Sequence, residues 1–142
     1  MPGPLGGIGI SQHFSKTMRT ARRFSRVFLE NFAKAKILGV RAGKEHRHTG
    51  VWVVVVEDRV FVRSWNDKPT GWFRAFANQR QGSVRLNDKE IAVHSRRTRS
   101  VRLQIAVSLA YAAKYDSKAS EKWVRGFSQP ERAINTLELV PA

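Results

Sequence analysis

The strongest pattern in this chain is a pair of apolar stretches joined by a short acidic turn. Val51–Val56 is apolar at every position, and Val60–Ser64 follows after Glu57 and Asp58. β-Branched residues without polar alternation predict a strand that is covered on both faces. The two stretches therefore predict a hairpin at the centre of the fold.

A second hairpin is predicted downstream, where apolar and polar residues alternate. Ser83–Leu86 and Glu90–His94 flank the pair Asn87–Asp88, whose residue types tolerate a tight turn. Asn135–Val140 alternates as well and predicts a closing strand. With Lys36–Arg41 as a first strand, the pattern gives about six strands.

The N-terminal part divides into a tail and a helix. The first ten residues, MPGPLGGIGI, are rich in Gly and Pro, and we expect residues 1–13 to be a disordered tail. From Phe14 to Phe32 apolar residues recur at helical spacing and basic residues occupy the other positions. This pattern predicts a basic amphipathic helix.

Further helices are predicted between and after the hairpins. One follows the loop after Ser64, with Thr70 as its cap, and another runs from Thr98 or Ser100 to Lys114. A shorter helix is expected over Ser120–Val124, before Gly126 and Pro130. The long helix should cover the sheet with a face that holds Val101, Ile105, Leu109 and Ala112 or Ala113.

Together these elements predict an α+β fold: a small six-stranded antiparallel barrel covered by three or four helices. At 142 residues the chain should form one domain, over residues 14–142. Cysteine is absent, which excludes disulfides and fits a reducing, cytoplasmic location. No apolar run approaches the roughly 18 residues that a membrane span needs.

Charge raises the possibility of an acidic partner. The formal net charge is +15, and residues 1–50 hold 10 basic and 2 acidic side chains. The N-terminal helix could therefore bind nucleic acid or an acidic membrane surface, or simply pack with a solvated basic face. Four arginines would contact nucleic acid in that alternative, together with base stacking on Trp and Phe: Arg22, Arg23, Arg96 and Arg97.

The loop after the first hairpin carries groups that suit an anion. Arg63, Ser64, Asn66 and Lys68 provide the guanidinium, hydroxyl, amide and ammonium donors that a phosphate uses. Asp67 would repel a phosphate, so the loop could instead use its polar side chains to stabilise its own turns. Both readings stay open from the residues alone.

The same residues carry a family resemblance over residues 24–142. The order of Val-rich strand, acidic turn, VFVRS strand, GWFR helix, AYAAKY and TLELVP resembles a bacterial family, the domain of unknown function 2255. That family resembles the split-barrel flavin-binding proteins of the pyridoxamine phosphate oxidase kind. RHTG, WVVVV, RSWNDKPT and GWF also stand where deazaflavin-dependent nitroreductases have similar segments.

The resemblance implies an FMN-binding split barrel that holds FMN or 8-hydroxy-5-deazaflavin at its side and acts as an oxidoreductase. FMN split barrels commonly complete the site across a homodimer, whereas similar deazaflavin proteins are often complete as monomers, so the oligomeric state stays open. The implied cofactor residues are Arg63, Ser64, Asn66 and Lys68 at the phosphate, Trp72 and Arg74 nearby, and Arg47 and His48 beside the ring or tail.

Other chemistries have less support. His46 and His48 would share one face of a strand, with His94 as a third ligand, but closed metal sites need three or four convergent ligands and surface histidines are the favoured interpretation. No nucleophile elbow is present, and the carboxylate pairs fall at turns. A barrel without a cofactor, serving an interaction or structural role, is the third alternative.

Overall fold

The computed structural model describes residues 3–5, 7–8 and 23–142. Two short strands near the N-terminus, β1 (Gly3–Leu5) and β2 (Gly7–Ile8), pair in parallel. The rest of the predicted tail, and the predicted helix from Phe14 to Arg22, lie outside the described residues. Disorder of the tail therefore stays a prediction.

The core of the molecule is a seven-stranded sheet in which all neighbouring strands are antiparallel. Its curvature gives a nearly closed barrel, which confirms the α+β barrel prediction with one more strand than expected. The order across the sheet is β4 (Thr49–Val51), β3 (Leu38–Ala42), β7 (Gln81–Leu86), β8 (Lys89–Arg97), β9 (Thr136–Pro141), β6 (Arg59–Arg63) and β5 (Val53–Val56).

The extra strand arises from a break at Trp52. β4 and β5 lie at the two opposite edges of the sheet order, yet only this residue separates them in the chain. Val51 pairs with Leu38 on β3, whereas Val53 pairs with Val62 on β6. The prediction of one continuous strand over Val51–Val56 is therefore wrong. Because a single residue joins both edges, the sheet must curl until they meet, and we call this meeting line the seam.

Both predicted hairpins are confirmed, and their turns share one backbone conformation. Glu57 and Asp58 have φ values of 54° and 59°, and Asn87 and Asp88 have values of 50° and 68°. Two consecutive residues in the left-handed region form the tight turn whose twist matches the flanking strands. Asp58, Asn87 and Asp88 are of residue types that tolerate that conformation better than most.

The N-terminal helix of the described chain, α2 (Arg26–Lys34), begins later than predicted. Ser25 is its N-cap and accepts a hydrogen bond from Phe28 N at 3.3 Å. Residues 23–25 are not helical, so an uninterrupted helix from Phe14 to Phe32 is wrong at this point. A serine side chain that accepts from a free backbone N–H favours the start of a helix. The backbone of Ser25 is itself extended, so a helix cannot continue through this residue.

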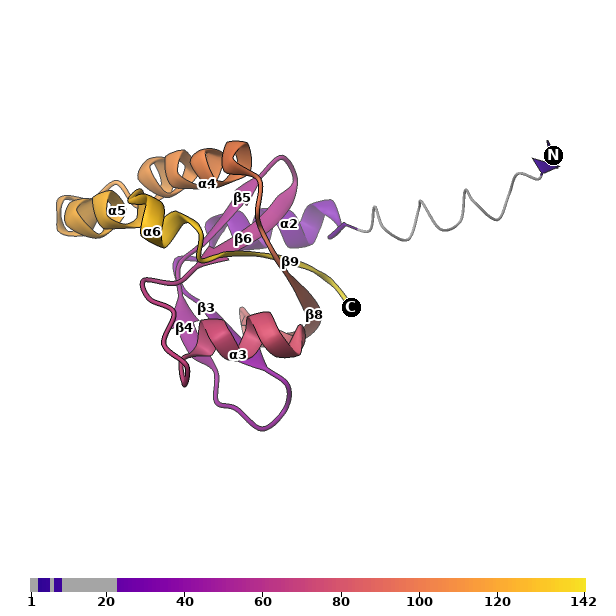
Figure 1. Ribbon diagram of the computed structural model, residues 1–142, viewed down its shortest axis with the longest axis horizontal. Helices are drawn as coiled ribbons and strands as arrows, with labels where there is room; N and C mark the ends of the chain where they lie inside the picture. The colour runs from indigo at the N-terminus through magenta and orange to yellow at the C-terminus, as the bar shows by residue number, and fades with distance from the viewer. Residues whose placement is uncertain (1–2, 6, 9–22) are drawn as a thin grey trace.

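Two further helices lie on opposite sides of the barrel (Figure 1). α3 (Trp72–Gln79) buries Phe73 and Phe76, and its N-cap is Gly71 without a side-chain cap, so the prediction of Thr70 as the cap is wrong. α4 (Val101–Lys114) is capped by Ser100, which accepts from Leu103 N at 3.2 Å, as expected.

The buried face of α4 differs from the predicted one. Leu103, Val107 and Tyr111 pack against Val54 and Phe61 of the barrel. The predicted covering face is exposed, with Val101 at 66%, Ile105 at 57% and Leu109 at 67% of full exposure; Ala112 and Ala113 are exposed too. Both stripes have helical spacing, so periodicity alone cannot choose between them.

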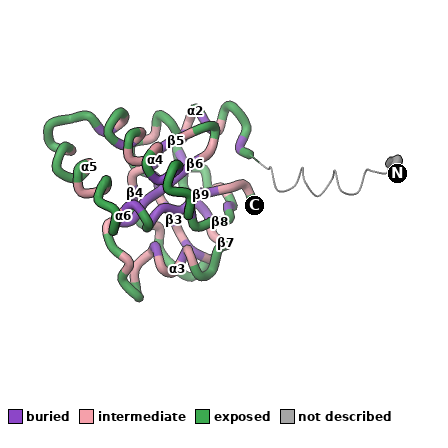
Figure 2. The backbone as a smooth tube through the Cα atoms, turned by 45° about the horizontal axis from the view of Figure 1, so that its top comes forward, coloured by how far each residue is buried: buried purple, intermediate pink, exposed green. Residues whose placement is uncertain are grey.

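After α4 the chain forms η1 (Lys118–Ser120), α5 (Glu121–Phe127) and α6 (Pro130–Ala133) before it returns as β9. The short helix predicted to end at Val124 continues through Gly126. One core cluster fills the barrel, and a second lies between α4 and the β5–β6 hairpin; the buried segments converge on the sheet in Figure 2. Among the described helices, none has the length and apolarity to cross a bilayer.

Candidate functional site

A pocket of about 350 Å³ opens at the seam of the barrel. Residues just before the break, the break itself and the end of β6 form one wall, and α3 and α5 contribute the others. Its lining is mostly apolar and aromatic: Ile37, Gly50, Val51, Trp52, Arg63, Ser64, Trp65, Trp72, Trp123 and Phe127. We call this cavity the seam pocket.

All four tryptophans of the chain line the seam pocket. Trp52 sits at the strand break, Trp65 follows β6, Trp72 is the first residue of α3, and Trp123 lies on α5. These positions are up to 71 residues apart, as the numbers 52 and 123 show. Only the closure of the sheet and the return of the C-terminal helices bring them together.

The aromatic walls are held by their own packing. Trp52 stacks on Tyr115 with ring centroids 4.1 Å apart and planes 6° apart. Trp65 meets Trp123 edge to face at 5.2 Å, and the guanidinium of Arg132 lies 3.7 Å from the centre of the Trp65 ring. Offset stacks and cation–π contacts of this kind fix ring orientation. The pocket is therefore formed without help from a ligand.

Gly126 explains how the Trp65 ring fits against α5. A Cβ atom at this position would lie 2.2 Å from the Trp65 ring, far closer than two carbon atoms can approach. A glycine in the interior of a helix normally costs about 1 kcal/mol relative to alanine. Here it provides the space in which the indole lies.

The only formally charged residue in the pocket lining is Arg63, and it is buried, with 2% of its surface exposed. Its guanidinium donates to Thr136 Oγ1, Ser108 Oγ, Phe127 O and Gln104 O at 2.7 to 2.8 Å. It forms no ion pair with a carboxylate of residues 23–142. Burial lowers the pKa of Arg63 below its usual value.

The loop predicted to hold an anion uses most of its polar groups on itself. Ser64 Oγ donates to Asn66 O at 2.6 Å, and Asn66 Oδ1 accepts from Lys68 N at 3.2 Å. Arg74 Nε donates to Asp67 Oδ1 at 2.8 Å, and this hydrogen bond holds the pKa of Asp67 below its ordinary value. The loop thus takes the self-structuring alternative.

The implied cofactor residues are only partly brought together. Arg63, Ser64 and Trp72 line the seam pocket, whereas Asn66, Lys68 and Arg74 do not. Asn66 and Lys68 are exposed beside it.

Arg47 and His48 lie elsewhere. Arg47 lines a separate cavity of about 180 Å³. Trp72 lines both this cavity and the seam pocket. His48 Nε2 lies 3.4 Å from Glu90 Oε2 without hydrogen-bond geometry. Within the described part of the chain, no three His, Asp or Glu side chains group as metal ligands.

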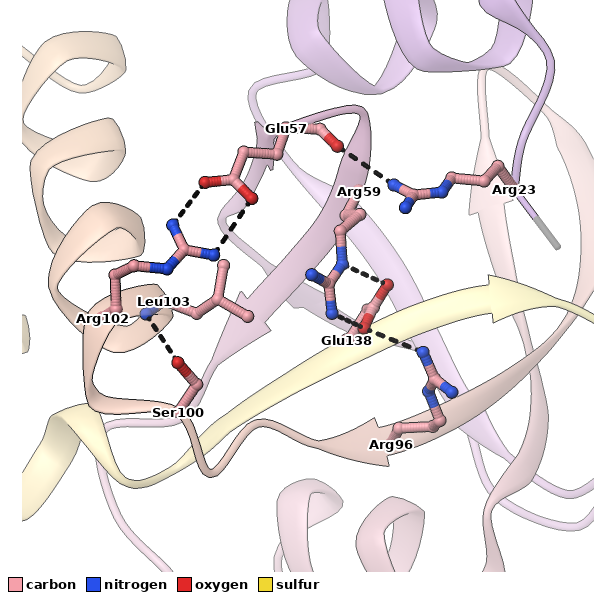
Figure 3. A network of polar contacts seen from close by, with 8 residues as sticks. All are labelled: Arg23, Glu57, Arg59, Arg96, Ser100, Arg102, Leu103 and Glu138. Carbon is pink, nitrogen blue, oxygen red and sulfur yellow. Dashed lines mark hydrogen bonds and ion pairs between the residues drawn. The ribbon is translucent and has the colours of Figure 1, made fainter. Parts of the chain in front are cut away.

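The arginines predicted to contact nucleic acid differ in their surroundings, and Figure 3 shows two of them, Arg23 and Arg96. Arg23 Nη1 donates to the Glu57 carbonyl at 3.1 Å, and Arg96 Nη2 donates to Glu138 Oε1 at 3.3 Å. Arg97 is exposed, with its guanidinium 5.0 Å from the centre of the Phe73 ring. Arg22 lies outside the described residues.

Glu138 anchors this network on β9. Arg59 binds both of its carboxylate oxygens, at 3.0 and 2.8 Å. Burial alone would raise the pKa of Glu138, but the hydrogen bond from Arg59 and the nearby charges of Arg59 and Arg96 outweigh burial and lower it. Arg96 therefore has a structural partner, while Arg97 does not share this carboxylate.

Sequence reasoning missed three of the four pocket tryptophans and Phe127. It placed Trp52 inside the hairpin core, whereas the structure leaves it half-buried at the break. One signal was present: Trp65 is a bulky aromatic residue in a loop otherwise composed of polar residues and proline. A large apolar ring in such a loop indicates packing that local pattern does not explain.

Comparison with known proteins identifies the family. Residues 29–139 match the family model described as "Uncharacterized protein conserved in bacteria (DUF2255)". The chain belongs to this family. No curated protein matches this DUF2255 chain.

A solved structure shows that the fold recurs. The crystal structure of the conserved hypothetical protein Rv2991 from Mycobacterium tuberculosis superposes with a TM-score of 0.51 at 9% identity. The similarity covers 85% of the DUF2255 chain and 81% of the mycobacterial one. At this identity the likeness concerns the fold alone.

Proposed function

We propose that this DUF2255 protein binds the planar aromatic ring of a flavin or 8-hydroxy-5-deazaflavin cofactor in the seam pocket and serves as an oxidoreductase. The observation that carries the proposal is the convergence of four tryptophans on one pocket. Indole faces stack on planar ring systems in offset or edge-to-face geometry. At about 350 Å³ the pocket falls at the lower end of the range of roughly 300–1,000 Å³ typical of small-molecule sites.

The surrounding residues fit such a group. A bound flavin or deazaflavin would supply the hydride or electron transfer, which the side chains of this chain do not provide. Trp52 and Trp65 would orient the ring, because each is already fixed by a neighbouring side chain. The exposed cation of Lys68, adjacent to the pocket in sequence, would face a tail phosphate better than the internally bonded Ser64.

A binding experiment tests this proposal. Purified protein is titrated with FMN, riboflavin and 8-hydroxy-5-deazariboflavin while tryptophan and ligand fluorescence are recorded. We expect quenching of both signals, together with a higher unfolding temperature, because a ligand that binds only the folded state stabilises it. If none of the three ligands changes either signal, the proposal is wrong.

Three variants localise the site. Trp123→Leu changes a pocket residue that is 46% exposed, and Leu109→Ala changes a more exposed apolar residue, at 67%, on α4 outside the pocket. We expect only the first to weaken binding. Lys68→Ala should weaken FMN binding more than riboflavin binding, since only FMN carries a phosphate.

Single-stranded nucleic acid is the second candidate, because a formal charge of +15 accompanies the exposed Trp123 and exposed Arg side chains such as Arg97. Bases stack on aromatic platforms beside cationic grooves, and such binding weakens steeply with salt. Arg97→Ala should then reduce affinity more than Arg96→Ala, because Arg96 is engaged by Glu138. Binding that is independent of salt would exclude this alternative.

A further inference from the structure

Arg63 places an uncompensated positive charge against the seam pocket. Four of its five N–H groups donate to hydroxyl and carbonyl oxygens, all of them neutral. Its surroundings therefore satisfy its hydrogen bonds but leave its charge in place. A buried ion without a counter-ion is expensive, because desolvation costs several kcal/mol that neutral dipoles repay only in part.

No neighbouring element neutralises this charge among the described residues. From α4, Tyr111 faces the guanidinium at 5.8 Å, and burial raises the pKa of its phenol so that it stays neutral. From β9, Thr136 is neutral, and the carboxylate of Glu138 is bound by Arg59 and Arg96.

A second cation lies beside the pocket. α6 places the guanidinium of Arg132 over the ring of Trp65, 3.7 Å from the ring centre. The nearest acidic residue in sequence, Asp67, is paired with Arg74. The pocket lining itself contains no acidic residue. The seam pocket thus has mostly apolar, aromatic walls, and the one formal charge in its lining is the cation of Arg63.

We infer that the seam pocket selects planar aromatic anions, in which the negative charge is delocalised into the ring, over neutral rings of the same shape. This inference rests on the proposed function and names the charge state of its ligand. Because only 2% of Arg63 is exposed, it acts through its field across the pocket wall rather than as an open ligand. Low-polarity walls make such a field stronger than it would be in water.

A matched pair of ligands tests the inference on the unmodified protein. 8-Hydroxy-5-deazariboflavin ionises at its hydroxyl group, and its 8-methoxy ether has almost the same shape but cannot ionise there. Dissociation constants of both are measured at pH values below and above the ionisation of the free hydroxyl ligand. We expect the hydroxyl ligand to bind at least about tenfold more tightly once ionised, and the two ligands to converge at low pH.

A spectroscopic reading accompanies the affinities. Ionisation of the hydroxyl changes the absorption spectrum of this ring, so the bound ligand can be titrated directly. Selection of the anion requires that binding shift the ionisation to lower pH by the same factor as the affinity ratio. An unshifted ionisation would overturn the inference.

The outcomes separate the two proposals. If both ligands bind with equal affinity at every pH, the anion preference is wrong and the aromatic pocket stands. If neither binds, the proposed function is wrong and the inference falls with it.

Variants assign the effect to Arg63. Arg63→Lys should keep the preference for the anion, and Arg63→Gln should abolish it. Arg97→Gln removes a charge outside the pocket and should leave the preference unchanged. If Arg63→Gln does not fold, the ligand pair on the unmodified protein still decides.

Discussion

Replacement of Tyr115 by phenylalanine tests how the seam is held together. The Tyr115 hydroxyl accepts a hydrogen bond from Val53 N at 3.1 Å and donates to Lys36 O at 2.7 Å. Val53 is the first residue after the strand break, and here the C-cap residue of α4, Tyr115, supplies the partner of its backbone N–H. The substitution removes the hydroxyl and keeps the ring that stacks on Trp52.

The expected loss follows from the groups left without partners. An unsatisfied buried donor or acceptor costs about 1–3 kcal/mol. Val53 N is buried, whereas Lys36 is exposed and water can reach part of its surroundings. We therefore expect Tyr115→Phe to lower the free energy of unfolding by about 2–3 kcal/mol. That corresponds to about 5–10 °C in melting temperature for a chain of this size.

Urea unfolding followed by tryptophan fluorescence measures this loss, with an unchanged m-value as the sign that only stability has changed. Tyr111→Phe is the matched control, because its hydroxyl makes a single bond, to Trp52 O at 3.2 Å. We expect the control to lose about 1 kcal/mol. A loss below about 0.5 kcal/mol in Tyr115→Phe, or one no larger than in the control, would show that the Tyr115 hydroxyl does not hold the seam.

Three further substitutions test other parts of the structure. Gly126→Ala should destabilise by about 2 kcal/mol or more and disturb Trp65 fluorescence, because the new Cβ would lie 2.2 Å from that ring; the ordinary gain of alanine in a helix would contradict this. Glu138→Gln should lose stability at neutral pH but approach the wild type in acid. Arg59 lowers the pKa of Glu138 in the folded state. The contribution of Glu138 to stability is therefore complete above its pKa in the unfolded chain and disappears as pH falls through its pKa in the folded protein. A stability difference between variant and wild type that stays constant with pH would exclude this. Burial lowers the pKa of Lys114 to about 8. Between about pH 8 and 10.5 the unfolded chain therefore holds a proton that the folded protein has lost, so the wild type should gain stability relative to Lys114→Met as pH rises through this window. A gain confined to lower pH would contradict the lowered pKa.

Local pattern predicted most of the secondary structure because short-range physics decides it. The hairpins follow from apolar stretches flanking residues that accept a left-handed backbone, as Glu57–Asp58 and Asn87–Asp88 do. The start of α4 follows from the hydroxyl of Ser100. On α4 two apolar stripes have the same helical spacing, so spacing alone could not decide which one is buried. The sequence analysis favoured the stripe that the structure exposes.

The candidate site was predicted less completely than the fold. The sequence selected Arg63, Ser64 and Trp72, which share the seam pocket, but it also selected Asn66 and Arg74, which bond within the loop and to Asp67. The polar residue types in a loop do not reveal whether their side chains bond within the loop or face a ligand. That depends on the backbone path, which the surrounding elements determine.

The order of residue types is sufficient to predict an α+β barrel of short antiparallel hairpins and an excess of positive charge. The tertiary structure alone decided that the apolar run breaks at Trp52, that its halves lie at opposite edges of the sheet, and that the seam gathers four tryptophans around a buried arginine. The physical reason is that alternation and helical spacing record contacts between near neighbours. Closure of a sheet, by contrast, depends on contacts between residues far apart in the chain, which no local pattern encodes.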